Sequence, residues 1–388
     1  MATKAKKATT VPLNWKEVYF TNCCMVAANN IDQELGWCKD DFKKIGVDYS
    51  YFRSRRENDY YPHYIHNLDN LIRFGGLYPP VHVHADMRRT RLLGATWVYE
   101  GGCMIVRARD PIYRMQDLKG KKVGLSKSLN TIKTDWWRIS EHQGIESMLR
   151  LNDMTMEDVE IVEFPYPDDW YDDPKMLEPL INPTELFATR DFKHDLDFRP
   201  LETSLLEGKV DAIYTLSKQF QHVQEDTGKI KAIEDLSRYP DWTVQVANTP
   251  AVITCSDVMA EEHPELVVTY MKAMIKVGRW ANEHKRAAAV ILDRQTLYRD
   301  PEDTYQGIKL VDMVPNLSPQ NMVCVEIGKD FMLSHGYIEN DFDVFEWAAP
   351  EFLEQAAKEL IEEEWKIRSE ARLPEPTTLE DAMKGRLG

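Results

Sequence analysis

The chain alternates short apolar runs of strand length with segments in which apolar residues follow helical spacing. An apolar run bounded by turn signals is typical of a buried strand, whereas helical spacing gathers apolar residues on one face. The expected strands are Lys16–Thr21, Val47–Arg53, Arg91–Val98, Cys103–Ala108, Lys122–Leu125, Val159–Phe164, Val210–Thr215 and Val244–Thr254. Strands that alternate with helices favour an α/β fold with largely parallel sheets.

The chain has 388 residues, which is enough for two lobes with their own cores. We predict lobe one over about 12–108 plus 250–355 and lobe two over about 109–249, followed by a peripheral C-terminal helix and tail over 356–388. The chain would then cross between the lobes near residues 108 and 250. We expect a ligand cleft between the lobes, because small-molecule sites are common at domain interfaces.

A long amphipathic helix is expected from about Pro264, since proline is favoured at a helix start. Its predicted buried face consists of Leu266, Val267, Tyr270, Met271, Met274, Ile275 and Val277.

Composition excludes several classes of function. The net charge of -16 argues against a nucleic-acid binder, which needs a basic face, and means that an anionic substrate needs a local cation. The six cysteines include no CxxC pair, so we expect reduced thiols. The sequence contains no run of about eighteen apolar residues, and the opening residues are basic without an apolar stretch, so we expect a cytoplasmic protein without a membrane span.

Polar residues follow the first expected strand directly. Asn22, Cys23 and Cys24 lie between that strand and a segment of helical spacing, and Asn22 is a candidate N-cap. A strand that ends in polar residues at a helix start is the usual place for a site in an open α/β sheet. A cysteine in this position is nevertheless most often an inert small apolar residue.

The segment His82–Asp86 (HVHAD) suggests a metal site, because His82 and His84 would share one face of a strand. No second cluster with ligand spacing accompanies it, so we assign no metal here. His63 and His66 have the spacing of one helix face.

Ser126, Ser128 and Asn130 precede an expected helix that starts near Asn130. They are candidates for anion binding at a helix N-terminus, and ordinary capping explains them equally well.

Three segments together resemble the substrate-binding proteins of sulfonate and thiamin-precursor uptake. These are DLKGKKVGLS at 117–126, LLEGKVDAIY at 205–214 and HPELVVTYMKAMIKVGRW at 263–280. The resemblance implies the type II periplasmic-binding-protein architecture.

A second set of motifs resembles the 2'-hydroxybiphenyl-2-sulfinate desulfinases of dibenzothiophene desulfurisation. The motifs are TNC at Thr21–Cys23, RFGG at Arg73–Gly76 followed by Pro79 and Pro80, RTRLLG at Arg89–Gly94 and EWAAPEFL at Glu346–Leu353. The resemblance implies a cofactor-free enzyme that removes sulfite from an aromatic sulfinate. It carries the family's functional cysteine, histidine and arginine to Cys23, His63 and Arg73.

These residue types suit such a reaction. Arg73 offers a planar, permanently charged fork for two sulfinate oxygens, and the amides around Gly75 and Gly76 can approach the substrate closely. Cys23 can act as proton donor or as nucleophile, with His63 tuning the thiol or moving the proton. The residues leave both routes open, and neither needs a metal or an organic cofactor.

Two other functions fit the same fold. One is a non-catalytic binding protein for an aromatic sulfonate or similar small anion, against which the missing export signal counts. The other is a decarboxylase or pyrimidine-forming enzyme. The sequence specifies neither the aryl group nor the oligomeric state.

Overall fold

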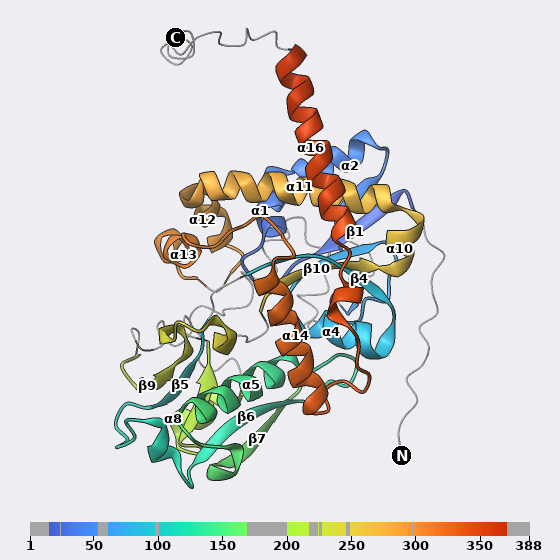
Figure 1. Cartoon of the computed structure of the whole chain (residues 1–388). Helices are drawn as coiled ribbons and strands as arrows, with labels where there is room; N and C mark the ends of the chain where they lie inside the picture. The colour runs from blue at the N-terminus through green and yellow to red at the C-terminus, as the bar shows by residue number, and fades with distance from the viewer. Residues whose placement is uncertain are drawn as a thin grey trace, which may run out of the picture.

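Two five-stranded sheets, each covered by helices, form the protein in a computed structural model (Figure 1). The structure describes residues 15–23, 25–52, 61–97, 101–168, 200–216, 224, 227–245, 249–296 and 298–370. Cys24, Arg53, Val98 and the tail after residue 370 therefore lie outside the described residues. The α/β prediction is confirmed.

The first sheet has the strand order β2-β1-β3-β10-β4. Its strands are β1 (Glu17–Thr21), β2 (Asp48–Tyr51), β3 (Leu71–Gly75), β4 (Thr90–Thr96) and β10 (Ala251–Ser256). Strands β2, β1 and β3 are parallel, whereas β10 runs antiparallel between β3 and β4.

The second sheet has the order β7-β6-β8-β5-β9. Its strands are β5 (Cys103–Arg107), β6 (Lys122–Ser128), β7 (Glu160–Tyr166), β8 (Ala212–Thr215) and β9 (Ile230–Asp235). Alternate residues of β5 pack into different cores, Met104 with residues of α5 (Trp136–Leu151) and Ile105 with residues of α8 (Pro200–Glu207). Because successive strand residues point to opposite faces, the two helices cover opposite faces of this sheet.

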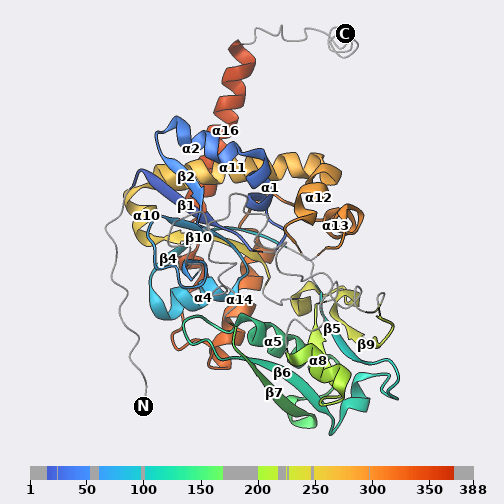
Figure 2. The same ribbon diagram turned by 180° about the vertical axis from the view of Figure 1, so that it is seen from behind.

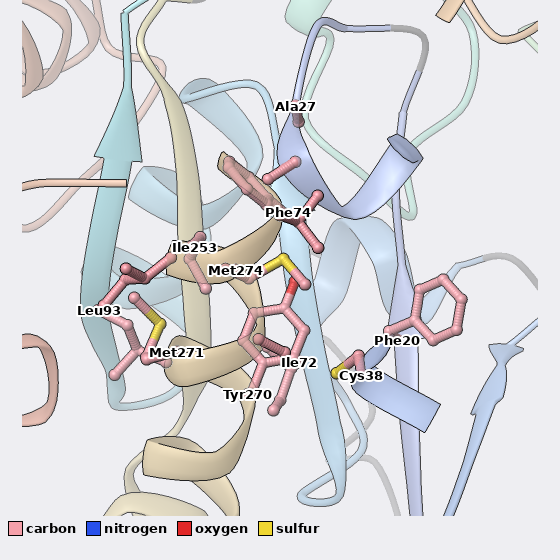
Figure 3. Packing of buried hydrophobic residues seen from close by; sticks show 14 of the residues in the cluster. Phe20, Ala27, Cys38, Ile72, Phe74, Leu93, Ile253, Tyr270, Met271 and Met274 are labelled. Carbon is pink, nitrogen blue, oxygen red and sulfur yellow. The ribbon is translucent and has the colours of Figure 1, made fainter. Parts of the chain in front are cut away.

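One face of the first sheet carries the largest core. It packs under α1 (Ala28–Leu35), α2 (Trp37–Lys44) and α11 (Pro264–Glu283), which lie on the same side of the sheet in Figures 1 and 2. In Figure 3, Met271 and Met274 of α11 lie against side chains of the strands. The predicted buried face of this helix is confirmed, since all seven of its residues are buried.

The other face of the first sheet packs against α4 (Tyr78–His82), α14 (Pro319–Ser334) and α15 (Val344–Trp347). The remaining α-helices of the described residues are α3 (Pro62–Ile65), α10 (Asp257–Glu262), α12 (Lys285–Asp293), α13 (Pro301–Ile308) and α16 (Pro350–Glu370). The start of α16 packs against α11, and its later turns lead away from the body of the protein in Figure 1. Among the described residues, no helix is long and apolar enough to span a membrane.

Three sequence expectations need correction. Residues 103–107 form β5 of the second sheet, so the chain changes sheets between Thr96 and Cys103, earlier than residue 108. The strand expected over Val244–Thr254 begins only at Ala251, and Trp242–Gln245 forms a short 3-10 helix. The segment 82–86 is helical, because prolines at positions 79 and 80 start α4 and a π-helix over Val83–Met87 continues it.

Candidate active site

A row of polar side chains crosses the first sheet. Thr21 of β1 and Thr254 of β10 are both register partners of Arg73 in β3, so the three side chains lie on the same face. The residues one position earlier on each strand belong to the opposite face and its core, for example Phe20 and Ile72 (Figure 3). Strand alternation thus places apolar side chains on one face and this row of buried polar side chains on the other.

His63 is fixed in this row from two directions. It lies in the single turn of α3, where its Nδ1 is 2.8 Å from the Thr21 hydroxyl oxygen. Its backbone carbonyl accepts a hydrogen bond of 2.8 Å from Nε of Arg73. The structure therefore brings together the predicted histidine and arginine, although ten residues separate them.

The absent side chain of Gly75 marks the point on which these groups converge. A Cβ atom placed there would lie 3.2 Å from Arg73 Nη2 and 3.2 Å from His63 Cε1. The glycine therefore lets the guanidinium and the imidazole lie close to the backbone of β3, in space that a side chain would need. Gly76, which follows β3 directly, is also buried.

Burial sets the electrostatics of the pair, since His63 is 2% exposed and Arg73 is 1% exposed. Burial, with the charges of Arg73 and His66 added to it, holds the pKa of His63 well below its usual 6.5. The imidazole is therefore neutral at neutral pH. A guanidinium in such a low-dielectric place attracts an anion more strongly than one at the surface.

Cys23 follows β1 and is partly exposed, unlike the other described cysteines, which are buried. Asn30, in the first turn of α1, donates to the Cys23 carbonyl at 3.0 Å, and Asn29 donates to the Thr21 carbonyl at 3.2 Å. These two amides hold the loop that carries the thiol. Asn22 is not the N-cap of α1, because the helix begins only after Ala27.

Ser126 and Asn130 lie in the second sheet and the loop after it. Ser126 is buried and donates from its amide and hydroxyl to Glu141, at 2.8 and 3.0 Å. Neither residue is at a helix N-terminus, because α5 begins at Trp136 and Asp135 caps it. The expected anion site at this helix start is therefore not formed by these serine and asparagine side chains.

Asn130 instead connects the second sheet to the surroundings of His63. Its side-chain nitrogen donates to the Tyr61 hydroxyl at 3.0 Å. Lys133, from the same loop, lies 5.1 Å from the ring centre of Tyr64, and that ring packs edge-on against His63. Sequence reasoning missed this contact, because no spacing relates residues 130–133 to residues 61–64.

Lys133 also forms a buried ion pair with Asp168, which accepts a hydrogen bond of 2.9 Å from the Ser128 hydroxyl.

Thr21 belongs to the TNC motif, which suggests no role for this residue. The alternation of side chains along a strand is the signal that puts Thr21 on the same face as Arg73.

The HVHAD segment has structural contacts. His84 packs beside Trp347 and Phe342, with Nδ1 3.2 Å from the Thr90 hydroxyl. Asp86 accepts hydrogen bonds from the backbone amides of Glu339 and Asn340. These contacts hold the π-helical turn over Val83–Met87 against the loop that follows α14.

Comparison with known proteins gives relatives of one kind. The chain is 26% identical over 317 residues to the 2'-hydroxybiphenyl-2-sulfinate desulfinases of Rhodococcus erythropolis and Rhodococcus qingshengii. The match covers 75% of this chain and 82% of each relative. The chain is a homologue of these desulfinases. No protein-family model matches it.

Solved structures agree on the fold. A cysteine-to-serine variant of the enzyme DSZB, in complex with biphenyl-2-sulfinic acid, superposes with a TM-score of 0.65 at 22% identity, covering 88% of this chain and 99% of that one. The sulfonate-binding protein SsuA from Methylobacillus flagellatus KT gives 0.59 at 16% identity, covering 89% and 94%. The predicted periplasmic-binding-protein-like architecture and the resemblance to the desulfinases are both confirmed.

Proposed function

We propose that this chain is an enzyme that hydrolyses the carbon–sulfur bond of an aromatic sulfinate and releases sulfite. In the balanced reaction the aryl carbon–sulfur bond breaks, the ring carbon gains a proton and water supplies an oxygen to sulfur. One sulfinate and one water thus give an arene and hydrogen sulfite. The observation that carries the proposal is the convergence of a buried guanidinium and a neutral imidazole at Gly75, each 3.2 Å from the position that a Cβ atom would take there.

Arg73 captures the sulfinate. The group is anionic at neutral pH. A guanidinium can bind two of its oxygens at once through two parallel N–H groups, whereas an ammonium acts as a single point charge. No side chain at Gly75 or Gly76 shields the backbone amides next to the cation, so these amides can add hydrogen bonds to the anion. These contacts strengthen as negative charge gathers on the departing sulfur group.

Cys23 carries the reaction. Thr21, the register partner of Arg73, is the last residue of β1, and Cys23 follows two positions later in the loop that continues from this strand. Gly75 lies two positions after Arg73 in the parallel strand β3, so we expect the thiol on the same side of the site as Gly75. As proton donor, the thiol protonates the ring carbon while sulfur dioxide leaves; hydration then gives hydrogen sulfite and returns the proton to the thiolate. As nucleophile, the thiolate binds sulfur, a proton reaches the ring carbon, and water cleaves the sulfur–sulfur bond.

His63 positions and relays the proton. Its contact with Thr21 fixes the ring, and its neutrality leaves one ring nitrogen able to accept a proton and the other to donate one. Neither route needs a metal or an organic cofactor. Asn130 and Lys133 bring the second lobe to Tyr61 and Tyr64, so an aromatic substrate would be enclosed beside His63.

A second candidate function is the binding of an aromatic sulfonate or similar anion without turnover. The likeness in fold to sulfonate-binding proteins favours it. A buried arginine beside Gly75 serves binding as well as catalysis, so only turnover separates the two candidates.

The test is to incubate the purified, chelator-dialysed protein with a panel of aryl sulfinates that includes biphenyl-2-sulfinate, and to assay sulfite and arene together. We expect stoichiometric release of both from at least one member. Calorimetric binding of sulfinates and sulfonates with no sulfite release would favour the binding protein. Activity that is lost on dialysis while the protein stays folded, and that zinc or iron restores equally in the parent and in His335→Ala, would contradict the cofactor-free chemistry.

A further inference from the structure

Helices α5 and α14 come from the two different halves of the protein and meet where the ion pair between Glu146 and His335 joins them. Helix α5 covers the second sheet, whereas α14 packs against α4 and α15 of the first. The two helices cross in Figure 1. A cavity of about 350 Å³ lies between them, lined by Gln143, Glu146 and Arg150 of α5 and by Ile327, Asp330 and His335 of α14 and its end.

Two histidines and a glutamate meet at this crossing. His142 and Glu146 are four residues apart on α5 and so share one face of the helix. Nε2 of His335 lies 2.8 Å from a carboxylate oxygen of Glu146, and the two imidazole rings are 4.7 Å apart. In the described part of the chain, this is the one place where three such side chains bring donor atoms within 4.8 Å of one another.

Each histidine is held by its Nδ1, which leaves Nε2 for a ligand. Nδ1 of His335 lies 2.9 Å from the Phe331 carbonyl, so it carries the proton and donates it. Nδ1 of His142 lies 2.9 Å from the Tyr337 hydroxyl. A histidine that ligates a metal through one nitrogen usually donates the other N–H to a carbonyl or another oxygen, which fixes the ring and its tautomer.

We propose that His142, Glu146 and His335 form a binding site for a divalent metal of the zinc class, which ties α5 to α14 across the two halves of the protein. Two imidazoles and one carboxylate are a common ligand set for zinc, with bonds of about 2.0–2.2 Å. Tetrahedral geometry then requires ligand atoms about 3.4 Å apart, which small side-chain rotations reach from the present spacing. Water fills the fourth coordination position of the metal, since Glu146 and His335 also line the cavity.

The alternative is a simple ion pair between His335 and Glu146. It accounts for two of the three residues, and an ion pair with this much exposure contributes little to stability. It does not involve His142, whose ring lies 4.7 Å from that of His335, whereas a metal would use both imidazoles and the carboxylate.

Equilibrium dialysis of the chelator-treated full-length protein against zinc chloride tests the proposal. We expect about one bound equivalent, with affinity reduced roughly 100-fold or more by His142→Ala or His335→Ala and about tenfold by Tyr337→Phe, which removes only the oxygen that orients His142. The matched control is His284→Ala. His284 also ends a helix, donates from Nδ1 to the carbonyl four residues earlier at 2.9 Å, and stacks on an aromatic ring there.

Thermal unfolding supplies a second readout, since zinc should raise the Tm of the parent and of His284→Ala but not of His335→Ala. A third needs no variant: zinc should protect His142 and His335, but not His284, from diethylpyrocarbonate, as mapped by mass spectrometry. Absence of binding, or binding that neither histidine substitution weakens and that protects neither residue, would overturn the site. These readouts do not involve sulfinate turnover, so they stand or fall apart from the proposed activity.

Discussion

Thr21 and His63, 42 positions apart in the sequence, meet at 2.8 Å between a hydroxyl oxygen and Nδ1 of an imidazole. Both residues are buried, and Thr21 is also the register partner of Arg73. A single threonine therefore sets the orientation of the imidazole and also lies opposite the arginine in the neighbouring strand.

Thr21→Val keeps the β-branched shape and removes the hydroxyl. We expect kcat for sulfite release to fall about tenfold or more, because the imidazole loses the contact that orients it. The loss in stability should be about 1 kcal/mol, as for one buried hydrogen bond. Thr96→Val is the control, since Thr96 is equally buried in the same sheet. Equal kcat in both variants would show that the Thr21 contact is only structural.

Gly75→Ala should damage catalysis more than folding. The added Cβ would lie 3.2 Å from both His63 and Arg73 and push each away by a few tenths of an ångström. We expect kcat/KM to fall about tenfold or more, because misplaced catalytic groups lose rate steeply. Gly94→Ala is matched for crowding, with contacts of 3.2 Å to Met271 and 3.3 Å to Pro315. It should lower Tm and leave kcat/KM near that of the parent; the reverse pattern would show that Gly75 is not part of the site.

Arg73→Lys keeps the charge and loses the fork. We expect a clear rise, about tenfold or more, in the Kd for an aryl sulfinate measured by calorimetry. A lysine variant that binds as tightly as the parent would contradict bidentate capture.

The pH dependence should reflect the depressed pKa of His63, whose cause is mainly burial, followed by the charge of Arg73. Below the unfolded-state pKa of about 6.5 the unfolded chain takes up a proton at this residue and the folded protein does not. Stability from this group is thus present above pH 6.5 and is lost as the pH falls below it. The free energy of unfolding of the parent should therefore drop faster than that of His63→Gln between pH 7 and 5.

The lowered pKa of His63 should also appear in the pH dependence of the activity. We expect no inflection near pH 6.5 in kcat/KM, since His63 stays neutral through that range. An inflection there that disappears in His63→Gln would mean that the imidazole is solvated in the working enzyme.

The sequence predicts the elements of the fold well where strand and helix periods are clear, as in Glu17–Thr21 and Pro264–Glu283. It fails where two periods compete. The alternating histidines at 82 and 84 have the spacing of a strand, but the prolines before them start a helix. Likewise, α5 starts at Trp136 rather than near residue 130, and the better signal was Asp135, a capping residue directly before an apolar run.

Some site residues can be predicted from sequence motifs, whereas others are found only in the folded structure. Cys23, His63 and Arg73 come from motifs, and the structure brings His63 and Arg73 into direct contact. The partners of these residues have no local signal, because Thr21 reaches His63, and Asn130 reaches Tyr61, only through the tertiary fold. The His142–Glu146–His335 cluster is similar, since its third member lies almost two hundred residues from the other two.

The identity of the reacting thiol is tested most directly by sulfite release from Cys23→Ser beside Cys24→Ala, with folding checked by circular dichroism. Cys24 lies outside the described residues, and the sequence alone predicts that only one of two adjacent side chains faces the site. Serine at position 23 keeps the shape but is a far weaker acid and nucleophile than a thiol. We expect Cys23→Ser to stay folded and lose sulfite release by orders of magnitude, while Cys24→Ala keeps most of it. An active Cys23→Ser, or an inactive but folded Cys24→Ala, would contradict the assignment of Cys23.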